Sequence, residues 1–129
     1  MGEFFGISII ILYVLTILKY IFRLINKYFG TALSKNEKFY NVYRKIVSII
    51  TKNHRVFGML TILFILAHFI VEFSKHGIIV TGVIAASFMI IQILLGLYAT
   101  ITKKINKSWM FIHRLISILI LVAILIHIS

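Results

Sequence analysis

Four long apolar segments constrain the fold of this chain more than any other feature. A helix that crosses a bilayer needs about 20 mostly apolar residues, and such segments run at roughly 4–25, 54–73, 77–101 and 109–128. The chain is 61% hydrophobic, which is more apolar surface than a small soluble domain hides. No proline interrupts the segments. We therefore predict an all-α fold, an integral membrane four-helix bundle that forms one domain over residues 1–129.

The link at 26–53 between the first two apolar segments is polar and basic. In its later part, Phe39, Tyr43, Ile46 and Ile50 recur at helical spacing. This pattern fits an amphipathic helix lying at the membrane interface. A cytoplasmic extension of the second span fits the same residues equally well.

The basic residues predict the orientation, because lysine and arginine collect on the cytoplasmic side of a membrane protein. Nine of the 14 basic residues lie between Lys19 and Arg55, four lie between Lys103 and Arg114, and only Lys75 lies in the turn between the second and third spans. The long link and the last turn are therefore expected to be cytoplasmic. Both termini are then outside, as in a multi-pass protein of the plasma membrane.

Charge and cysteine content exclude several classes of protein. The net charge of +11 comes from residues that flank apolar segments and not from one wettable face, which argues against a nucleic acid partner. The absence of cysteine excludes disulfides, iron–sulfur clusters, thiolate metal sites and thioether attachment of haem. The first apolar segment has no basic region before it and no small-residue cleavage site, so we expect a retained span and not a signal peptide.

Two spans carry histidines at the same interval. His54 and His68 lie fourteen residues apart on the second span, as do His113 and His127 on the fourth. Fourteen helical residues rise about 21 Å and return to within about 40° of the starting face. The two spans run in the same direction, so His54 is expected level with His113, and His68 level with His127.

Paired imidazoles at two depths fit the axial ligands of two b-type haems. Small residues accompany them. Gly58 and Ser117 follow His54 and His113, the two inner histidines expected on the cytoplasmic side, by four residues each. Gly82 and Gly96 lie fourteen residues apart on the third span. A missing side chain leaves room for a porphyrin edge. A single histidine would fit an interhelical hydrogen bond as well, and a single glycine would fit close helix packing. The recurrence of both at one interval favours two haem b groups.

With His-x13-His on the second and fourth spans and Gly-x13-Gly on the third, the chain resembles the N-terminal haem bundle of bc-type cytochrome b over residues 4–128. Similar histidine ladders occur in cytochrome b561-like proteins and in ferric-reductase and NADPH-oxidase transmembrane domains. The resemblance implies the same two histidine pairs as haem ligands and the same third-span glycines as haem contacts. The quinol-site motif of full cytochrome b is not found in these residues, so the resemblance implies the haem core and not quinol oxidation.

Other polar residues allow two interpretations each. Arg55 and Arg114 follow the inner histidines and could pair with haem propionates, although anchoring at the cytoplasmic surface explains them too. Gln92 is expected to form a structural hydrogen bond and not a quinone contact. His76 is interpreted as a solvated residue of the outer turn, and Trp109 as an interfacial anchor. The methionines that could ligate iron are interpreted as packing residues: Met59, Met89 and Met110.

These patterns predict a membrane b-type cytochrome that moves electrons across the bilayer, with no catalytic residues of its own. Its expected partners are lipid and a redox partner protein or quinone, with the chain acting as a homodimer or as a subunit of a complex. One alternative is a quinone-linked haem anchor of a larger dehydrogenase or reductase. Another is a haem-free structural or transport-related protein whose histidines serve polar packing.

Overall fold

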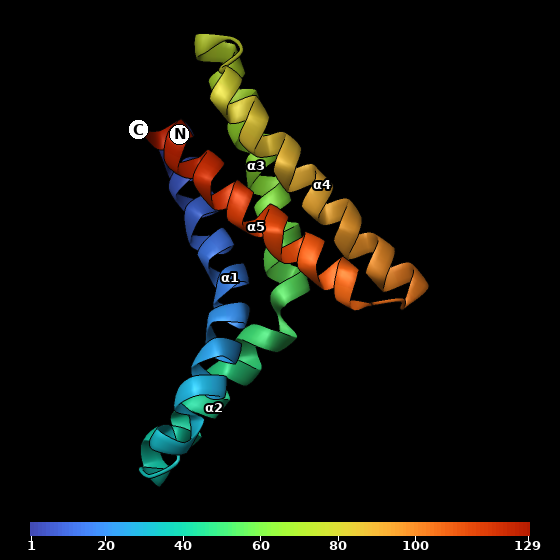
Figure 1. The fold of residues 1–129 in the computed structure, drawn as a ribbon. Helices are drawn as coiled ribbons and strands as arrows, with labels where there is room; N and C mark the ends of the chain where they lie inside the picture. Colours follow the sequence, from blue (N-terminus) through green and yellow to red (C-terminus); the bar gives the residue numbers. More distant parts are fainter. The chain divides into compact units, whose positions relative to one another are not determined.

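The computed structural model describes residues 1–129, and every regular element is an α-helix (Figure 1). The five helices are α1 (Gly2–Leu33), α2 (Glu37–Lys52), α3 (His54–His76), α4 (Val80–Thr102) and α5 (Lys107–Ile128). All except α2 are long and apolar enough to cross a membrane. The predicted all-α class and its four apolar helices are confirmed, while the closed bundle and the outward termini stay predictions.

Helix α1 continues beyond the predicted end of the first span at residue 25 and stops at Leu33. The residues that follow 25 include lysine and leucine, which favour helix, and no proline interrupts them. Its 32 residues rise about 48 Å, against about 30 Å for the hydrocarbon core of a bilayer. If α1 crosses a membrane, part of it therefore extends beyond the hydrocarbon.

Helix α2 is a separate helix and not a continuous extension of the second span. The side chain of Asn36 caps its start by accepting a hydrogen bond from the backbone N–H of Phe39, at 3.2 Å. Asn53 alone separates it from α3, and both its backbone N–H and its side-chain amide donate to the carbonyl of Ile49. The position of α2 at a membrane interface stays a prediction.

The turn between α3 and α4 has the predicted length of three residues but lies three residues later in the chain, at 77–79. Helix α3 runs through His76, so this residue is helical and the prediction of a loop residue was wrong. Gly77 then takes a positive φ of 74°, which glycine adopts without steric cost and which ends the helix. Helix α4 begins at Val80, three residues later than the predicted start of the third span at 77.

Close contacts divide the chain into two units. The first unit contains Met1 and Glu3–Phe64, and the second contains Gly2 and Ile65–Ser129. In the first unit α2 folds back along α1. The two helices are joined by the hydroxyl of Tyr43, which donates to the carbonyl of Phe22 at 3.3 Å, and the rings of these residues meet edge to face. This contact joins the long link to the first apolar helix.

In the second unit α4 and α5 pack as an antiparallel pair (Figure 1). Lys103, with a left-handed φ of 55°, ends α4, and the side chain of Asn106 caps α5 by accepting from the backbone N–H of Trp109. The indole N–H of Trp109 donates back to the carbonyl of Leu95 at 3.2 Å. The pair therefore has polar contacts close to the loop that joins it.

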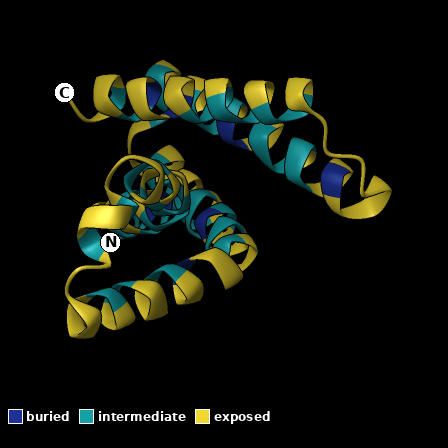
Figure 2. Ribbon diagram, turned by 60° about the horizontal axis from the view of Figure 1, so that its bottom comes forward, coloured by how far each residue is buried: buried dark blue, intermediate teal, exposed yellow.

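Few side chains are buried, as the scarcity of dark segments in Figure 2 shows. Ile120 on α5 is fully covered, and Thr61 on α3 is covered with its hydroxyl donating to the carbonyl of Phe57. Leucine, isoleucine, valine and phenylalanine side chains are exposed along all four apolar helices. Such surfaces suit helices that face lipid, because contact between apolar side chains and lipid tails costs much less free energy than contact with water.

Candidate functional site

Two of the four histidines that recur at the fourteen-residue interval lie side by side. His68 on α3 and His127 on α5 both belong to the second unit, and their ring centres are 6.2 Å apart. Their planes are nearly perpendicular, at 85°. The structure thus brings together the two rings that the sequence placed at one depth, and what they bind stays a prediction.

A backbone carbonyl orients the first of these rings. Nδ1 of His68 donates to the carbonyl oxygen of Gly2 at 3.1 Å. Because a carbonyl oxygen only accepts, this contact requires the proton on Nδ1. The neutral ring therefore carries its free lone pair on Nε2, which is the form in which imidazole binds a metal.

A threonine hydroxyl orients the second ring. Nδ1 of His127 lies 3.0 Å from Oγ1 of Thr81, in the first turn of α4. When this hydroxyl accepts the proton of Nδ1, Nε2 of His127 is left with a lone pair as well. Both rings thus use Nδ1 for a protein partner, as metal-binding histidines do.

The separation of the two ring centres is close to that of two imidazoles bound to one metal ion. A bond between imidazole nitrogen and a first-row metal is about 2 Å long, so two such nitrogens are about 4 Å apart. Each ring centre lies about 1 Å beyond its nitrogen, so the two centres are about 6 Å apart in such a complex. The observed 6.2 Å between His68 and His127 agrees with this requirement. The angle between the rings adds no restriction, because each ring can turn about its own metal bond.

Gly82 makes room for the ring of His127. A Cβ atom at Gly82 would lie 3.0 Å from Cε1 of His127, closer than ordinary van der Waals contact. The sequence predicted that this glycine lets a haem edge approach; in the structure its free side faces the imidazole. At the other two predicted glycines, Gly58 and Gly96, a Cβ would meet nothing within 4 Å, which leaves space beside both helices.

An apolar cavity of about 170 Å³ adjoins Thr81 between α4 and α5. Ala123, one helical turn before His127, is buried at its wall. The remaining lining residues are apolar: Ile84, Phe88, Leu119, Val122 and Ile126. Most of these side chains are exposed, so the cavity is open to the surface, and it is apolar apart from the Thr81 hydroxyl.

The inner histidines, His54 and His113, lie in different units, and their pairing stays a prediction. His54 begins α3 in the first unit. Its ring hydrogen-bonds to the backbone of Thr16 and lies near the positive charges of Lys19 and Arg55. In the second unit the ring of His113 stacks on the indole of Trp109, with centres 4.8 Å apart and planes at 14°.

The other candidates around the inner histidines have structural contacts. The side-chain amide of Gln92 donates to the carbonyl of His113 at 2.9 Å and to the hydroxyl of Ser117 at 2.6 Å. The predicted structural hydrogen bond of Gln92 is thus present and joins α4 to α5. Arg55 directly follows His54 and Arg114 directly follows His113, and pairing with propionates stays a prediction for both.

Sequence reasoning missed the partners of the outer histidines. Gly2 contributes only its carbonyl, which no residue type signals. Thr81 stands beside the predicted glycine Gly82 as a polar residue at the start of an apolar helix, and that signal could have identified it. Trp109 was predicted as an interfacial anchor, and its stacking on His113 was not foreseen.

Comparisons with known protein families, with curated proteins and with solved structures found no match for this chain. The structure also contains no group of three or more histidine, cysteine, aspartate or glutamate residues that could hold a metal ion. Axial ligation of a haem iron needs only two protein ligands. The candidate site therefore depends on the geometry of the histidine pair and its surroundings.

Proposed function

We propose that this chain is a membrane b-type cytochrome that moves electrons across the bilayer through two haem groups with paired histidine ligands. His68 and His127 would hold the haem nearer the outer surface, and His54 and His113 the one nearer the cytoplasm. When bound, the two groups would supply one-electron carriers at two depths of the membrane.

One observation supports the proposal more than any other. The rings of His68 and His127 stand 6.2 Å apart with each Nδ1 held by a protein group. Ligation requires a lone pair on each Nε2, which His68 has and which His127 has when Thr81 accepts its Nδ1 proton; the distance between the ring centres is close to that of two imidazoles on one ion.

The residues around this pair have distinct roles in the proposal. The Gly2 carbonyl would orient the imidazole of His68 and raise its basicity, and the Thr81 hydroxyl would do the same for His127 by accepting its Nδ1 proton. Gly82 lets the His127 ring lie close to the α4 backbone. The apolar side chains around Ala123 would give a bound redox group surroundings of low polarity, which influences its potential.

The same hydrogen bonds support a second candidate function, a haem-free helical protein in which the histidines join helices. Interhelical hydrogen bonds of this kind stabilise membrane proteins by about 1 kcal/mol each. In that case His68 and His127 would serve packing alone. The two functions differ in whether the purified protein binds haem.

Electron transfer across vesicles tests the proposed function. The full chain, expressed with an adequate supply of haem, is reconstituted into vesicles that enclose ascorbate, and membrane-impermeant ferricyanide is added outside. We expect ferricyanide reduction well above that of protein-free vesicles, together with oxidation and reduction of a low-spin haem spectrum. Haem-containing vesicles that reduce no more ferricyanide than protein-free vesicles would contradict transmembrane electron transfer.

A further inference from the structure

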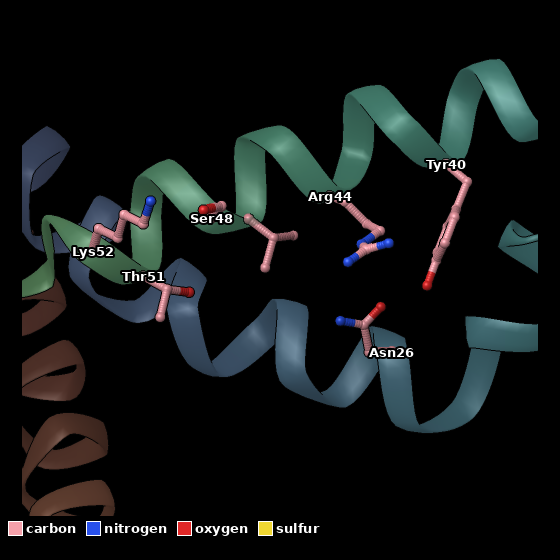
Figure 3. Close-up of a pocket in the computed structure, with 7 residues that line it drawn as sticks. Asn26, Tyr40, Arg44, Ser48, Thr51 and Lys52 are labelled. Carbon is pink, nitrogen blue, oxygen red and sulfur yellow. The ribbon is translucent and has the colours of Figure 1, made fainter.

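A second cavity, remote in sequence from the outer histidine pair, lies in the first unit between α1 and α2. Its volume is about 330 Å³. Arg44 and Tyr40 extend from α2 toward Asn26 on α1 (Figure 3). The other lining residues lie further along α2: Val47, Ser48, Thr51 and Lys52. We call this cavity the α1–α2 pocket.

The α1–α2 pocket is lined by hydrogen-bond donors and positive charge. The guanidinium of Arg44 offers five N–H groups, the amide of Asn26 two, and the hydroxyls of Tyr40, Ser48 and Thr51 one each. Lys52 adds a second positive charge at one end. Such a donor set matches an anion with several oxygen atoms, above all a phosphate.

No carboxylate competes for these donors. The chain has only three acidic residues, and none of them lines the pocket or pairs with Arg44. Arg44 instead lies over the ring of Tyr40, with Cζ 5.8 Å from the ring centre. This contact holds the guanidinium in place while leaving its N–H groups to a ligand.

The position of the pocket along α1 indicates the source of the phosphate. The Tyr43–Phe22 contact fixes α2 against α1, and Asn26 follows Phe22 by one helical turn. There the predicted span ends, among the basic residues Lys19, Arg23 and Lys27 of α1. If α1 crosses a membrane, this level corresponds to the phospholipid headgroups.

We propose that the α1–α2 pocket binds the phosphate of an anionic membrane phospholipid, with Arg44 as its main contact. The site shares no residue with the proposed haem ligands, so a negative result for lipid binding would not contradict the proposed electron transfer, and the reverse also holds. A zwitterionic lipid such as phosphatidylcholine carries the same phosphate beside a cationic choline, which Arg44 and Lys52 would repel. The site is therefore expected to prefer phosphatidylglycerol.

Native mass spectrometry of the full chain in detergent tests this proposal. Wild-type protein is incubated with phosphatidylglycerol or phosphatidylcholine, and lipid adducts are counted. We expect Arg44→Gln to weaken retention of phosphatidylglycerol roughly fivefold, the effect of one basic residue at a lipid surface. Arg44→Lys should fall between wild type and Arg44→Gln, because it keeps the charge but loses the bidentate contact.

Lys45→Gln is the matched control, since it removes the same charge from the next residue of α2, which does not line the pocket. Retention close to wild type in Lys45→Gln supports the site, and equal losses in Arg44→Gln and Lys45→Gln would overturn it. Asn26→Leu changes the opposite wall and should also weaken retention. Circular dichroism of each variant shows whether the helices are intact.

A third arm distinguishes the lipid from a soluble anion. Inorganic phosphate is added in excess to protein that retains phosphatidylglycerol. We expect the lipid to stay bound, because its acyl chains add apolar contacts that free phosphate lacks. Complete displacement by inorganic phosphate would overturn the lipid assignment in favour of a soluble phosphate ligand.

Discussion

Oγ1 of Thr81 lies 3.0 Å from Nδ1 of His127, and the adjacent Gly82 leaves the space that this imidazole fills. Two neighbouring residues of α4 thus control a histidine of α5. One supplies a hydrogen-bond partner and the other the absence of a side chain. The orientation of His127 therefore depends on α4, a helix that contains no histidine, and this dependence can be tested by substitution.

Replacing Thr81 by valine keeps the shape of the side chain and removes its hydroxyl. Loss of such a partner typically weakens metal binding about 10- to 100-fold, so under the proposed function we expect Thr81→Val to lose much of the outer haem on dilution. Haem titration followed by absorbance measures this. Thr102→Val is the control, because the hydroxyl of Thr102 donates to the carbonyl of Tyr98, accepts from the backbone N–H of Lys104 and contacts no histidine. Equal haem affinities in both variants would show that Thr81 has no orienting role.

Adding a methyl group at Gly82 should displace the ring of His127. The new Cβ would lie 3.0 Å from Cε1 of that ring, so Gly82→Ala is expected to weaken binding of the outer haem and to shift its low-spin spectrum. At Gly30 on α1 a Cβ meets nothing within 4 Å. Gly30→Ala should leave haem binding unchanged and stabilise the helix by about 0.5–1 kcal/mol. An unchanged spectrum in Gly82→Ala would argue against close contact between Gly82 and the ring of His127.

Removing one imidazole of the outer pair should remove one haem. Under the proposed function we expect His68→Ala to retain about half of the wild-type haem, since the outer haem would lose one of its two histidine ligands. His76→Ala is a matched control on the same helix, where the imidazole lies 3.0 Å from a carboxylate oxygen of Glu72 and is exposed. Haem content per protein, determined by extraction, checks both variants. Full haem content in His68→Ala would refute the pairing with His127.

The contact between α1 and α2 should weaken at alkaline pH. Partial burial, and to a lesser extent the neighbouring Tyr40, raise the pKa of Tyr43 above its ordinary value of 10.0. The neutral phenol is thus favoured in the fold, so its contribution is complete below pH 10 and is lost as the pH rises from 10 through the raised pKa. Ultraviolet titration of the phenolate and circular dichroism measure this. Tyr43→Phe should reduce the alkaline loss of helix, and an unchanged loss would assign it to other groups.

The long apolar helices could be predicted because length and composition alone identify a membrane-spanning segment. Their ends could not. Helix α1 passes residue 25 because charged residues such as Lys27 are good helix formers, and the turn at Gly77 depends on a backbone angle that composition does not signal. Apolar patterns thus locate a helix but not the residue at which it stops.

The candidate site was predictable to a similar extent. Spacing alone placed His68 and His127 at one depth, because the helical rise is fixed. Their hydrogen-bond partners depend on how separate segments meet, and the partner of His68 is the Gly2 carbonyl, a group that every residue possesses. The proximity of His68 and His127 could therefore be predicted, but the contacts that orient their rings could not.

Haem stoichiometry of the purified wild-type chain tests the central claim most directly. Protein expressed with an adequate haem supply is quantified, and its haem is extracted as the pyridine complex. The proposed function predicts two b-type haems per chain, with a Soret band that sharpens on reduction and the alpha band of low-spin haem. A colourless protein under the same conditions would contradict haem ligation by these histidines.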